Sequence, residues 1–364
     1  MKKKLIIFMP SIEGGGVEKN LFLVSNYMSK KLDKVALITI SKKYKKKFNN
    51  QIEFISLASN YWDNLSRRSK YFLSIVLLIK EILKNRNIIV FAFQANIYAI
   101  IICKLFSIKV IARSNSAPAG WSNNILKRLV FKFFLNLADK VMVNSIQFKK
   151  DLRKEFNVNA TCIYNPLNYD EIIKKKNKKS KKIFTNKKIL KILNIGRLTE
   201  QKNQITFLKA LNHIKKTIKF EAVIVGRGKL YKDLSGYIIK NNLSQFVKII
   251  DFVDNPFPLL KQTELFILSS KYEGLPNVLL EALTLRKFII SSKCPTGPQE
   301  ILLNGKGGLL FDVENHKQLA NKIMYYQENK KECLIMLNRS VKKLYRFDYQ
   351  INLKKYLNLV NQLS

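Results

Sequence analysis

The sequence is poor in the residue types on which metal sites and disulfide frameworks depend. Its 364 residues include only two histidines and four cysteines. The cysteines are Cys103, Cys162, Cys294 and Cys333. They form no C-x-x-C pair, so neither a zinc site nor a set of disulfides is expected, and a reducing compartment is consistent with them. His213 and His316 are far apart in the sequence and lie near expected helices, so we interpret both as surface residues rather than metal ligands.

Long apolar segments are also missing. No segment reaches the ~18 uninterrupted apolar residues of a membrane-spanning helix. The nearest candidate, residues 88–102, is interrupted by Gln94 and Asn96. The N-terminal lysines are followed by only a short apolar stretch before Pro10, whereas a signal peptide needs a longer one. We therefore expect a cytoplasmic protein, one that is able to lie on a membrane surface.

Acidic residues are scarce relative to basic ones. The chain has 66 Lys and Arg against 25 Asp and Glu, which gives a net charge of +41. Such a charge favours polyanionic partners: nucleic acid, anionic lipid or phosphorylated substrates. The charge is spread along the chain, and no helix-turn-helix or RNA-binding signature is present, so nucleic acid is not expected. An alternative is that the excess reflects composition alone, since the sequence is rich in Lys, Asn and Ile.

Short runs of Ile, Val and Phe recur at regular intervals, separated by segments of helical period. This alternation indicates parallel sheets covered by helices on both faces. The chain is too long for one core, and a lysine-rich block interrupts the pattern midway. The expected domains are residues 1–168, a linker at 169–188, residues 189–345, and a helix at 346–364. Ligands of doubly wound sheets bind where strands end, so the cleft between the domains is the expected site.

The few glycines follow expected strands. Gly14, Gly15 and Gly16 come after the first strand and before a helix, where free N–H groups can hold an anion or simply form a tight turn. In the second domain, Gly196 is followed by Arg197 and Lys202, a spacing that suits a diphosphate.

Two glutamates stand eight residues apart around the start of an expected helix. Glu273 lies in the loop, and Glu281 lies on the helix among apolar residues. A carboxylate in such surroundings needs hydrogen-bond donors, and sugar hydroxyls are suitable ones. An ordinary glutamate on a helix face is the alternative.

Together these segments resemble the retaining glycosyltransferases of family 4, which have the GT-B fold of two tandem Rossmann-like domains. The segment Glu273-Gly-Leu-Pro-Asn-Val-Leu-Leu-Glu281 is similar to the family's E-x7-E motif, and Gly196-Arg197 with Lys202 to its diphosphate-binding segment. Val225-Gly226 with Gly228 resembles the turn near the nucleobase, and Gly15-Gly16-Val17-Glu18 resembles the family's first glycine loop. The segment from Cys294 to Leu310 is similar to that of members that build bacterial surface polysaccharides.

The resemblance implies transfer of a hexose or N-acetylhexosamine from a UDP-sugar to a lipid-linked or surface-glycan acceptor. It assigns residues 1–168 to the acceptor and residues 189–345 to the nucleotide sugar, and it implies that the helix at 346–364 packs back on the first domain. It assigns catalysis to Arg197, Lys202 and Glu273, and donor binding to Gly15, Gly16, Gly196, Gly226, Val253, Gly274, Leu275, Pro276, Asn277 and Glu281. No Asp-x-Asp motif is present, and Arg197 and Lys202 can neutralise the diphosphate, so neither a metal nor another cofactor is expected. A nucleotide-sugar epimerase or hydrolase, or a phosphorylase, are alternative activities of the same fold.

The chain departs from many family members at one point, since residues 1–168 contain no histidine. The comparable strand end reads Ala112-Arg113-Ser114-Asn115. Arg113 and Asn115 are candidates for the acceptor side, and a surface position for Arg113 is an equal alternative.

Two segments of helical spacing, residues 66–84 and 123–140, combine apolar stripes with basic residues. In the second, the stripe comprises Ile125, Leu129, Phe133 and Leu137, flanked by Lys127, Arg128 and Lys132. Either the stripes pack on the sheet, or the helices contribute to peripheral binding on the inner face of the cytoplasmic membrane, where each basic residue near anionic lipid adds ~1 kcal/mol.

Overall fold

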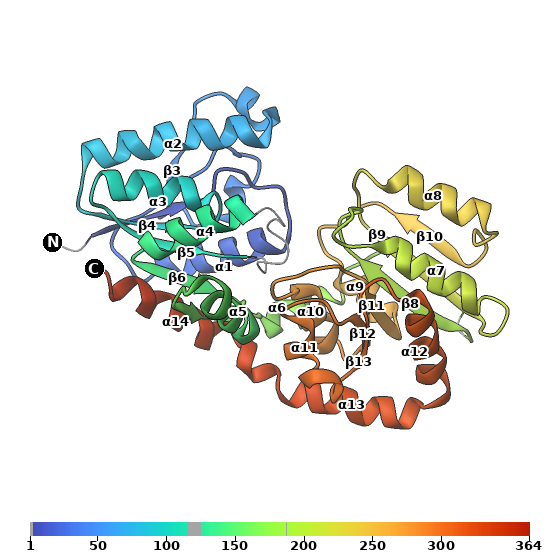
Figure 1. Ribbon diagram of the computed structural model, residues 1–364. Helices are drawn as coiled ribbons and strands as arrows, with labels where there is room; N and C mark the ends of the chain where they lie inside the picture. The colour runs from blue at the N-terminus through green and yellow to red at the C-terminus, as the bar shows by residue number, and fades with distance from the viewer. Residues whose placement is uncertain (1–2, 116–124, 187) are drawn as a thin grey trace. The chain divides into compact units, whose positions relative to one another are not determined.

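The computed structural model describes residues 3–115, 125–186 and 188–364. They form two compact units, the first comprising Met1–Pro166 with Tyr349–Ser364 and the second comprising Leu167–Asp348. Each unit is built around one parallel sheet with helices packed against it (Figure 1). The predicted α/β class with two doubly wound sheets and a helical C-terminal segment is confirmed.

The first unit has a seven-stranded sheet in the order β3-β2-β1-β4-β5-β6-β7. Its strands are β1 (Lys4–Phe8), β2 (Val35–Ile38), β3 (Glu53–Ile55), β4 (Ile88–Ala92), β5 (Lys109–Arg113), β6 (Lys140–Val143) and β7 (Ala160–Cys162). Every pairing is parallel. All residues of β2 and β4 are buried, as expected of parallel strands that are covered on both faces.

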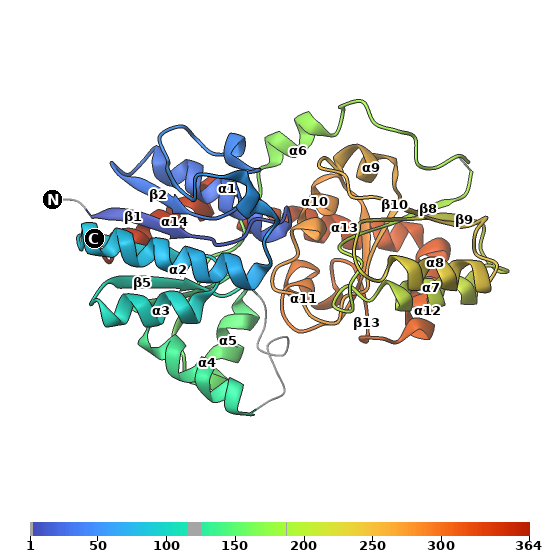
Figure 2. The same ribbon diagram turned by 90° about the horizontal axis from the view of Figure 1, so that it is seen from above.

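Helices cover both faces of this sheet (Figure 2). They are α1 (Gly16–Ser29), α2 (Arg67–Lys84), α3 (Asn96–Leu105), α4 (Ile125–Leu137), α5 (Ile146–Phe156) and α14 (Tyr349–Asn361), with short 3-10 helices at Lys45–Lys47 and Asn60–Asn64. Buried residues of α2, α3, α4 and α5 share one apolar core, and those of α1 and α14 share the other. Two helices begin with hydroxyl caps: Ser66 accepts the N–H of Ser69, and Ser145 accepts the N–H of Phe148.

The second unit has a six-stranded sheet in the order β10-β9-β8-β11-β12-β13. Its strands are β8 (Leu190–Ile195), β9 (Phe220–Val225), β10 (Val247–Ile250), β11 (Leu265–Leu268), β12 (Phe288–Ser292) and β13 (Leu309–Phe311). Its helices are α6 (Tyr169–Lys175), α7 (Gln204–Ile214), α8 (Tyr231–Lys240), α9 (Phe257–Gln262), α10 (Asn277–Thr284), α11 (Pro298–Ile301), α12 (His316–Glu328) and α13 (Lys330–Lys342), with 3-10 helices at Leu303–Gly305 and Leu344–Phe347.

Residues 169–188, expected as a linker, begin with a helix. Asn168 caps α6 by accepting the N–H of Glu171, and Ile172 is buried. Helix α6 contacts α9 and α10, which places it within the second unit. The rest of the block follows as an irregular segment, in which Gln262 accepts the N–H of Ile183.

The helix of residues 125–137 does not bury the predicted stripe. In α4 only Leu135 is buried, whereas Ile125, Leu129, Phe133 and Leu137 are exposed, and Leu126 and Val130 beside them are exposed as well. The alternative in which this stripe packs on the sheet is therefore wrong. Residues 123 and 124 of the predicted segment lie outside the described residues. Helix α2, by contrast, packs on the sheet, because its residues Leu78 and Ile82 lie in the apolar core.

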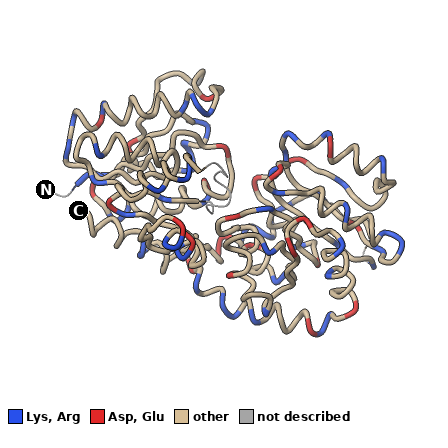
Figure 3. The backbone as a smooth tube through the Cα atoms, viewed as in Figure 1, with Lys and Arg blue, Asp and Glu red and all other residues tan. Residues whose placement is uncertain are grey.

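Basic residues occur along both units and are not concentrated at one end (Figure 3). Among the residues described, no helix combines the length and hydropathy needed to cross a membrane.

Candidate active site

The order of the second sheet identifies where a ligand is expected. Strand β8 pairs with β9 on one side and with β11 on the other. The chain therefore runs from β8 through β9 to β10 on one side of the sheet and then crosses to β11 on the other side, so the strand order reverses at β8. A crevice forms outside the carboxyl ends of the strands at such a point, and ligands of doubly wound sheets bind there. The loops that follow β8 and β11 carry the predicted segments 196–203 and 269–277.

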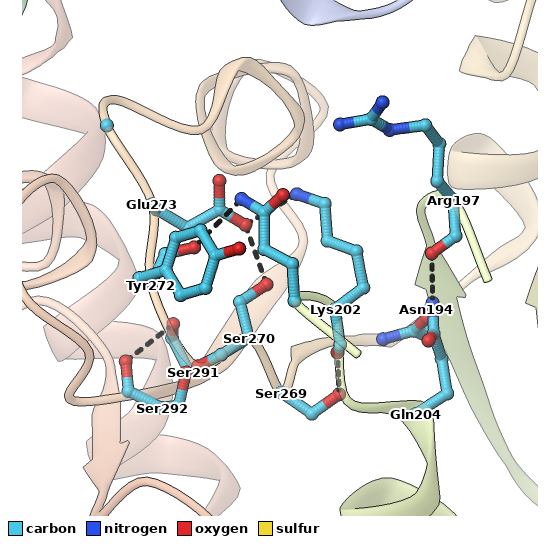
Figure 4. A network of polar contacts seen from close by, with 12 residues as sticks. Asn194, Arg197, Lys202, Gln204, Ser269, Ser270, Tyr272, Glu273, Ser291 and Ser292 are labelled. Atoms are coloured by element: carbon cyan, nitrogen blue, oxygen red, sulfur yellow. Dashed lines mark hydrogen bonds and ion pairs between the residues drawn. The ribbon is translucent and has the colours of Figure 1, made fainter. Parts of the chain in front are cut away.

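An ion pair joins these two loops (Figure 4). The Nζ atom of Lys202 lies 2.5 Å from Oε1 of Glu273, and the two side chains are only 17% and 8% exposed. The same carboxylate oxygen accepts the hydroxyl of Ser270 at 2.6 Å. Both charged groups are largely removed from water, and separating them would leave each one buried without a partner. The pair is therefore held together in the folded protein. The structure thus brings together two of the three predicted catalytic residues.

Further hydrogen bonds hold the two loops against each other. Ser269 donates its hydroxyl to the carbonyl of Lys202 at 2.9 Å. The backbone of Gln201 accepts the N–H of Lys271 at 2.8 Å, and its side-chain amide donates to the carbonyl of Tyr272 at 3.0 Å. The position of the ion pair is therefore set by backbone contacts on both sides.

Arg197, the third predicted catalytic residue, is exposed. Its carbonyl accepts the side-chain amide of buried Gln204 at 3.0 Å, which fixes the backbone while the side chain extends outward (Figure 4). Among the described residues, no carboxylate forms a salt bridge with its guanidinium. The site therefore combines one paired cation and one unpaired cation beside a strand end.

The predicted glycines allow close approach of backbones. A Cβ atom on Gly226 would lie 1.9 Å from the carbonyl oxygen of Gly196, so only glycine fits where the loop after β9 meets the loop after β8. A Cβ atom on Gly228 would lie 2.3 Å from the carbonyl oxygen of Leu198. A Cβ atom on Gly196 would be 3.3 Å from Cγ of Lys202, a tight contact. These glycines shape the loops that carry the cations.

The loop after Glu273 is held by the segment that follows β12. Thr296 donates its hydroxyl to the carbonyl of Glu273 at 2.7 Å. Gly297 has φ +58°, and a Cβ atom there would lie 2.0 Å from the carbonyl oxygen of Gly274. The start of the segment 294–310, which resembles that of surface-polysaccharide enzymes, therefore holds the loop that carries Glu273 in place.

Most of the remaining predicted donor residues lie around the start of α10. Gly274, Leu275 and Pro276 are buried, Asn277 is partly buried, and Glu281 is buried on the helix. Val253 follows β10 and is partly exposed. All of these positions belong to the second unit.

One feature near these loops was missed by the sequence analysis. The guanidinium of Arg227, just after β9, lies 4.8 Å from the ring centroid of Phe252, just after β10. Strands β9 and β10 are neighbours, so their ends bring the two side chains together. The sequence did contain a signal for this contact, since each of the two residues lies two positions after the end of a strand.

In the first glycine loop, the Glu18 carboxylate accepts hydrogen bonds from backbone N–H groups of the loop. Gly15 donates its N–H to Oε2 of Glu18 at 2.9 Å, and Glu13 donates its N–H to Oε1 of Glu18 at 3.3 Å. Glu18 thus caps α1 with its own carboxylate, as in a capping box. The predicted phosphate contact at Gly15 requires this carboxylate to be displaced, and Gly16 follows as the first residue of the helix.

Of the two acceptor-side candidates, Arg113 is buried and Asn115 is partly exposed. Arg113 is fully buried, which overturns its interpretation as a surface arginine. Its Nη2 donates to Oδ1 of Asn165 at 3.0 Å, and its guanidinium lies 4.9 Å from the ring centroid of Phe93. Asn115 donates its side-chain amide to the carbonyl of Phe93 at 2.8 Å. Both side chains support the end of β5.

The two histidines, distant in sequence, lie on helices that contact each other, α7 and α12. Partial burial and the charges of Lys209 and Lys317 lower the pKa of His316, and His213 has a smaller effect in the same direction. Within the described part of the chain, no three His, Cys, Asp or Glu side chains are grouped as metal ligands.

Comparison with known proteins identifies the family of the second unit. Residues 174–343 match the family described as Glycosyl transferases group 1. A Campylobacter jejuni protein named N-acetylgalactosamine-N,N'-diacetylbacillosaminyl-diphospho-undecaprenol 4-alpha-N-acetylgalactosaminyltransferase is 27% identical over 95% of this chain and 96% of its own length. An uncharacterized glycosyltransferase of Methanocaldococcus jannaschii is 36% identical over 48% of this chain and 44% of its own.

Solved structures support the same fold. The HepE protein of Anabaena, crystallised in complex with UDP-glucose, aligns with a TM-score of 0.77 and 16% identity over 99% of this chain and 100% of its own. Sucrose-phosphate synthase of Thermosynechococcus elongatus aligns with a TM-score of 0.81 and 15% identity over 99% of both chains. Residues 174–343 thus match the glycosyl transferases group 1 family, and the chain is a glycosyltransferase with the GT-B fold.

Proposed function

We propose that the protein transfers a hexose or N-acetylhexosamine from a UDP-sugar to a lipid-linked glycan, with retention of anomeric configuration and without a metal. The observation that carries this proposal is the Lys202–Glu273 ion pair beside the exposed Arg197, at the strand ends where a nucleotide ligand is expected. The lipid-linked acceptor is supported by the Campylobacter relative, whose name specifies a diphospho-undecaprenol acceptor.

The reaction breaks the bond between the anomeric carbon and the β-phosphate oxygen. A hydroxyl oxygen of the acceptor forms the new glycosidic bond on the same face, and its proton passes to the departing phosphate oxygen. Negative charge grows on the diphosphate as the bond breaks, and Arg197 and Lys202 stabilise that charge. No nucleophile of the protein takes part in this route.

Glu273 has two functions in this proposal. It holds the Lys202 ammonium in place through the 2.5 Å contact, and it accepts hydrogen bonds from hydroxyls of the donor sugar. Ser270 restricts the carboxylate through its 2.6 Å hydrogen bond. A positioned cation costs no reorganisation when charge develops, which is how such a site lowers the barrier.

The nucleoside is assigned to the neighbouring strand ends. Glu281 accepts from the ribose hydroxyls, and Val253 lies next to the base. The Arg227–Phe252 pair offers a flat, partly exposed face beside this position.

Peripheral membrane binding is assigned to the first unit. The exposed apolar stripe of α4 and the adjacent basic residues Lys127 and Lys132 give a helix that can lie at the interface of an anionic membrane.

The proposal is tested by incubating the full chain with a panel of nucleotide sugars and an undecaprenyl-diphosphate-linked disaccharide, with EDTA present. A lipid-linked trisaccharide of retained configuration, identified by mass spectrometry and NMR, is the expected product. Free sugar in place of the trisaccharide identifies a hydrolase instead. Activity that appears only after Mg²⁺ or Mn²⁺ is added contradicts the metal-free route.

A further inference from the structure

The first sheet has its own point of reversal, between β1 and β4. The loops that follow these strands are joined there, because the N–H of Ser11 donates to Oε1 of Gln94 at 3.0 Å. Ala95, next in the chain, has φ 56° and ψ 38°, a left-handed conformation that is unfavourable for a residue with a Cβ atom. Backbone strain of this kind is often found at binding sites, and the reversal point is where a ligand is expected.

Two aromatic rings lie near this point. Tyr71 in the first turns of α2 and Tyr98 in the first turn of α3 have ring centroids 6.3 Å apart at an interplanar angle of 71°. Arg67 donates from Nε to the hydroxyl of Tyr71 at 3.0 Å. Tyr71 is partly buried and held in place by this bond, whereas Tyr98 is 51% exposed.

A carboxylate acts electrostatically on Tyr71. Glu13, in the loop after β1, is exposed and accepts the hydroxyl of Ser11 at 3.3 Å. Burial raises the pKa of Tyr71, the charge of Glu13 adds to this rise, and Arg67 opposes it. Arg67 and Tyr98 contact Tyr71, and the charge of Glu13 acts on it; we name these four residues the tyrosine cluster.

We propose that the tyrosine cluster binds a pyranose ring of the acceptor glycan. The exposed ring of Tyr98 offers an apolar surface to the C–H face of a sugar, and the Glu13 carboxylate offers an acceptor for its hydroxyls. Arg67 positions Tyr71, which supports Tyr98 edge to face. The assignment of this sugar as the acceptor rests on the function proposed above.

Several features separate this cluster from ordinary surface packing. A tyrosine that only completes a core is buried, whereas half of Tyr98 is open to solvent. Arg67 donates to the Tyr71 hydroxyl and the charge of Glu13 acts on the same residue, a pattern that suits a neutral polyhydroxyl ligand better than a lipid tail.

Saturation-transfer NMR on the full chain tests the cluster directly. The probes are the methyl α-glycosides of N-acetylgalactosamine, N-acetylglucosamine, galactose and glucose. We expect at least one of them to bind, and Tyr98→Ala to weaken that binding by about tenfold. Tyr98→Phe keeps the ring and is expected to bind normally.

Tyr61→Ala is the matched control, because Tyr61 is an exposed tyrosine of the same unit that lies edge-on to Trp62. Equal binding by Tyr98→Ala and the unmodified chain, or no binding of any glycoside, overturns the proposal. UDP binding, followed by thermal shift, reports separately on the donor site. If UDP does not bind but a glycoside still depends on Tyr98, the cluster stands and the proposed function fails.

Discussion

Lys202 and Glu273 are 71 residues apart in the sequence, yet their charged groups meet at 2.5 Å. The contact exists because β8 and β11 are neighbours in the sheet and each side chain follows its strand within a few residues. A cation and an anion from two loops are thus locked together at the position expected for the donor diphosphate. The proposed mechanism depends on this relationship.

Removing either cation is expected to slow transfer strongly. Arg197→Ala or Lys202→Ala leaves the growing charge of the diphosphate unsupported, so we expect kcat to fall on the order of 10²–10³. Steady-state kinetics with the active nucleotide sugar measures the loss. Lys271→Ala is the control, since Lys271 lies in the neighbouring loop after β11 and pairs with Glu314. A similar loss in the control variant would indicate a general effect on the loop.

Substitution of the two glutamates is expected to change different properties, UDP affinity in one case and turnover in the other. Glu281→Gln removes the proposed ribose contact, so the Kd for UDP should rise while the folded structure persists. Glu273→Gln weakens the hold on Lys202 and on the sugar, so kcat should fall while UDP still binds. Calorimetric titration with UDP, combined with turnover measurements, separates the two effects. Unchanged UDP affinity in both variants rules out the ribose assignment.

A pair of glycine substitutions tests the packing of the nucleotide loops. Gly226→Ala places a Cβ atom 1.9 Å from the carbonyl oxygen of Gly196, so we expect a loss of ~3 kcal/mol in the free energy of unfolding. Gly236 is exposed in α8 with nothing within 4 Å of its Cβ position. Gly236→Ala is therefore expected to raise stability by up to ~1 kcal/mol. Urea denaturation of both variants provides the comparison, and equal effects would contradict the structure of the loop.

Membrane binding by the full chain should require both anionic lipid and the stripe on α4. Phe133→Glu is expected to abolish sedimentation with vesicles that contain anionic lipid. Binding by the unmodified chain should weaken with salt, because the screening length falls from ~10 Å at 0.1 M to ~3 Å at 1 M. Ile239→Glu, an equally exposed apolar position on α8, serves as the control. Equal binding to neutral and anionic vesicles would show that the net charge of +41 is not what attracts the membrane.

The sequence analysis succeeded where a pattern is local. Alternating apolar runs predicted both sheets, and the segment around Glu273 predicted a loop followed by the helix that carries Glu281. The surface position considered for Arg113 is wrong, and nothing in a strand-end arginine reveals that Asn165 and Phe93 will enclose it. The tyrosine cluster was also out of reach, since its members come from a loop and two helices that only the folded sheet brings together.

The chain leaves the first unit after Pro166 and returns at Tyr349, where Leu167 and Asp348 run side by side in a parallel bridge. Residues 353–360 of α14 supply Leu353, Tyr356, Leu359 and Val360 to the core of the first unit. During synthesis, this core therefore stays incomplete until the whole of residues 167–348 has been made. The second unit is contiguous and can fold earlier. A ribosome that stalls within the second unit would leave the first with an exposed apolar face, a target for chaperones and proteases.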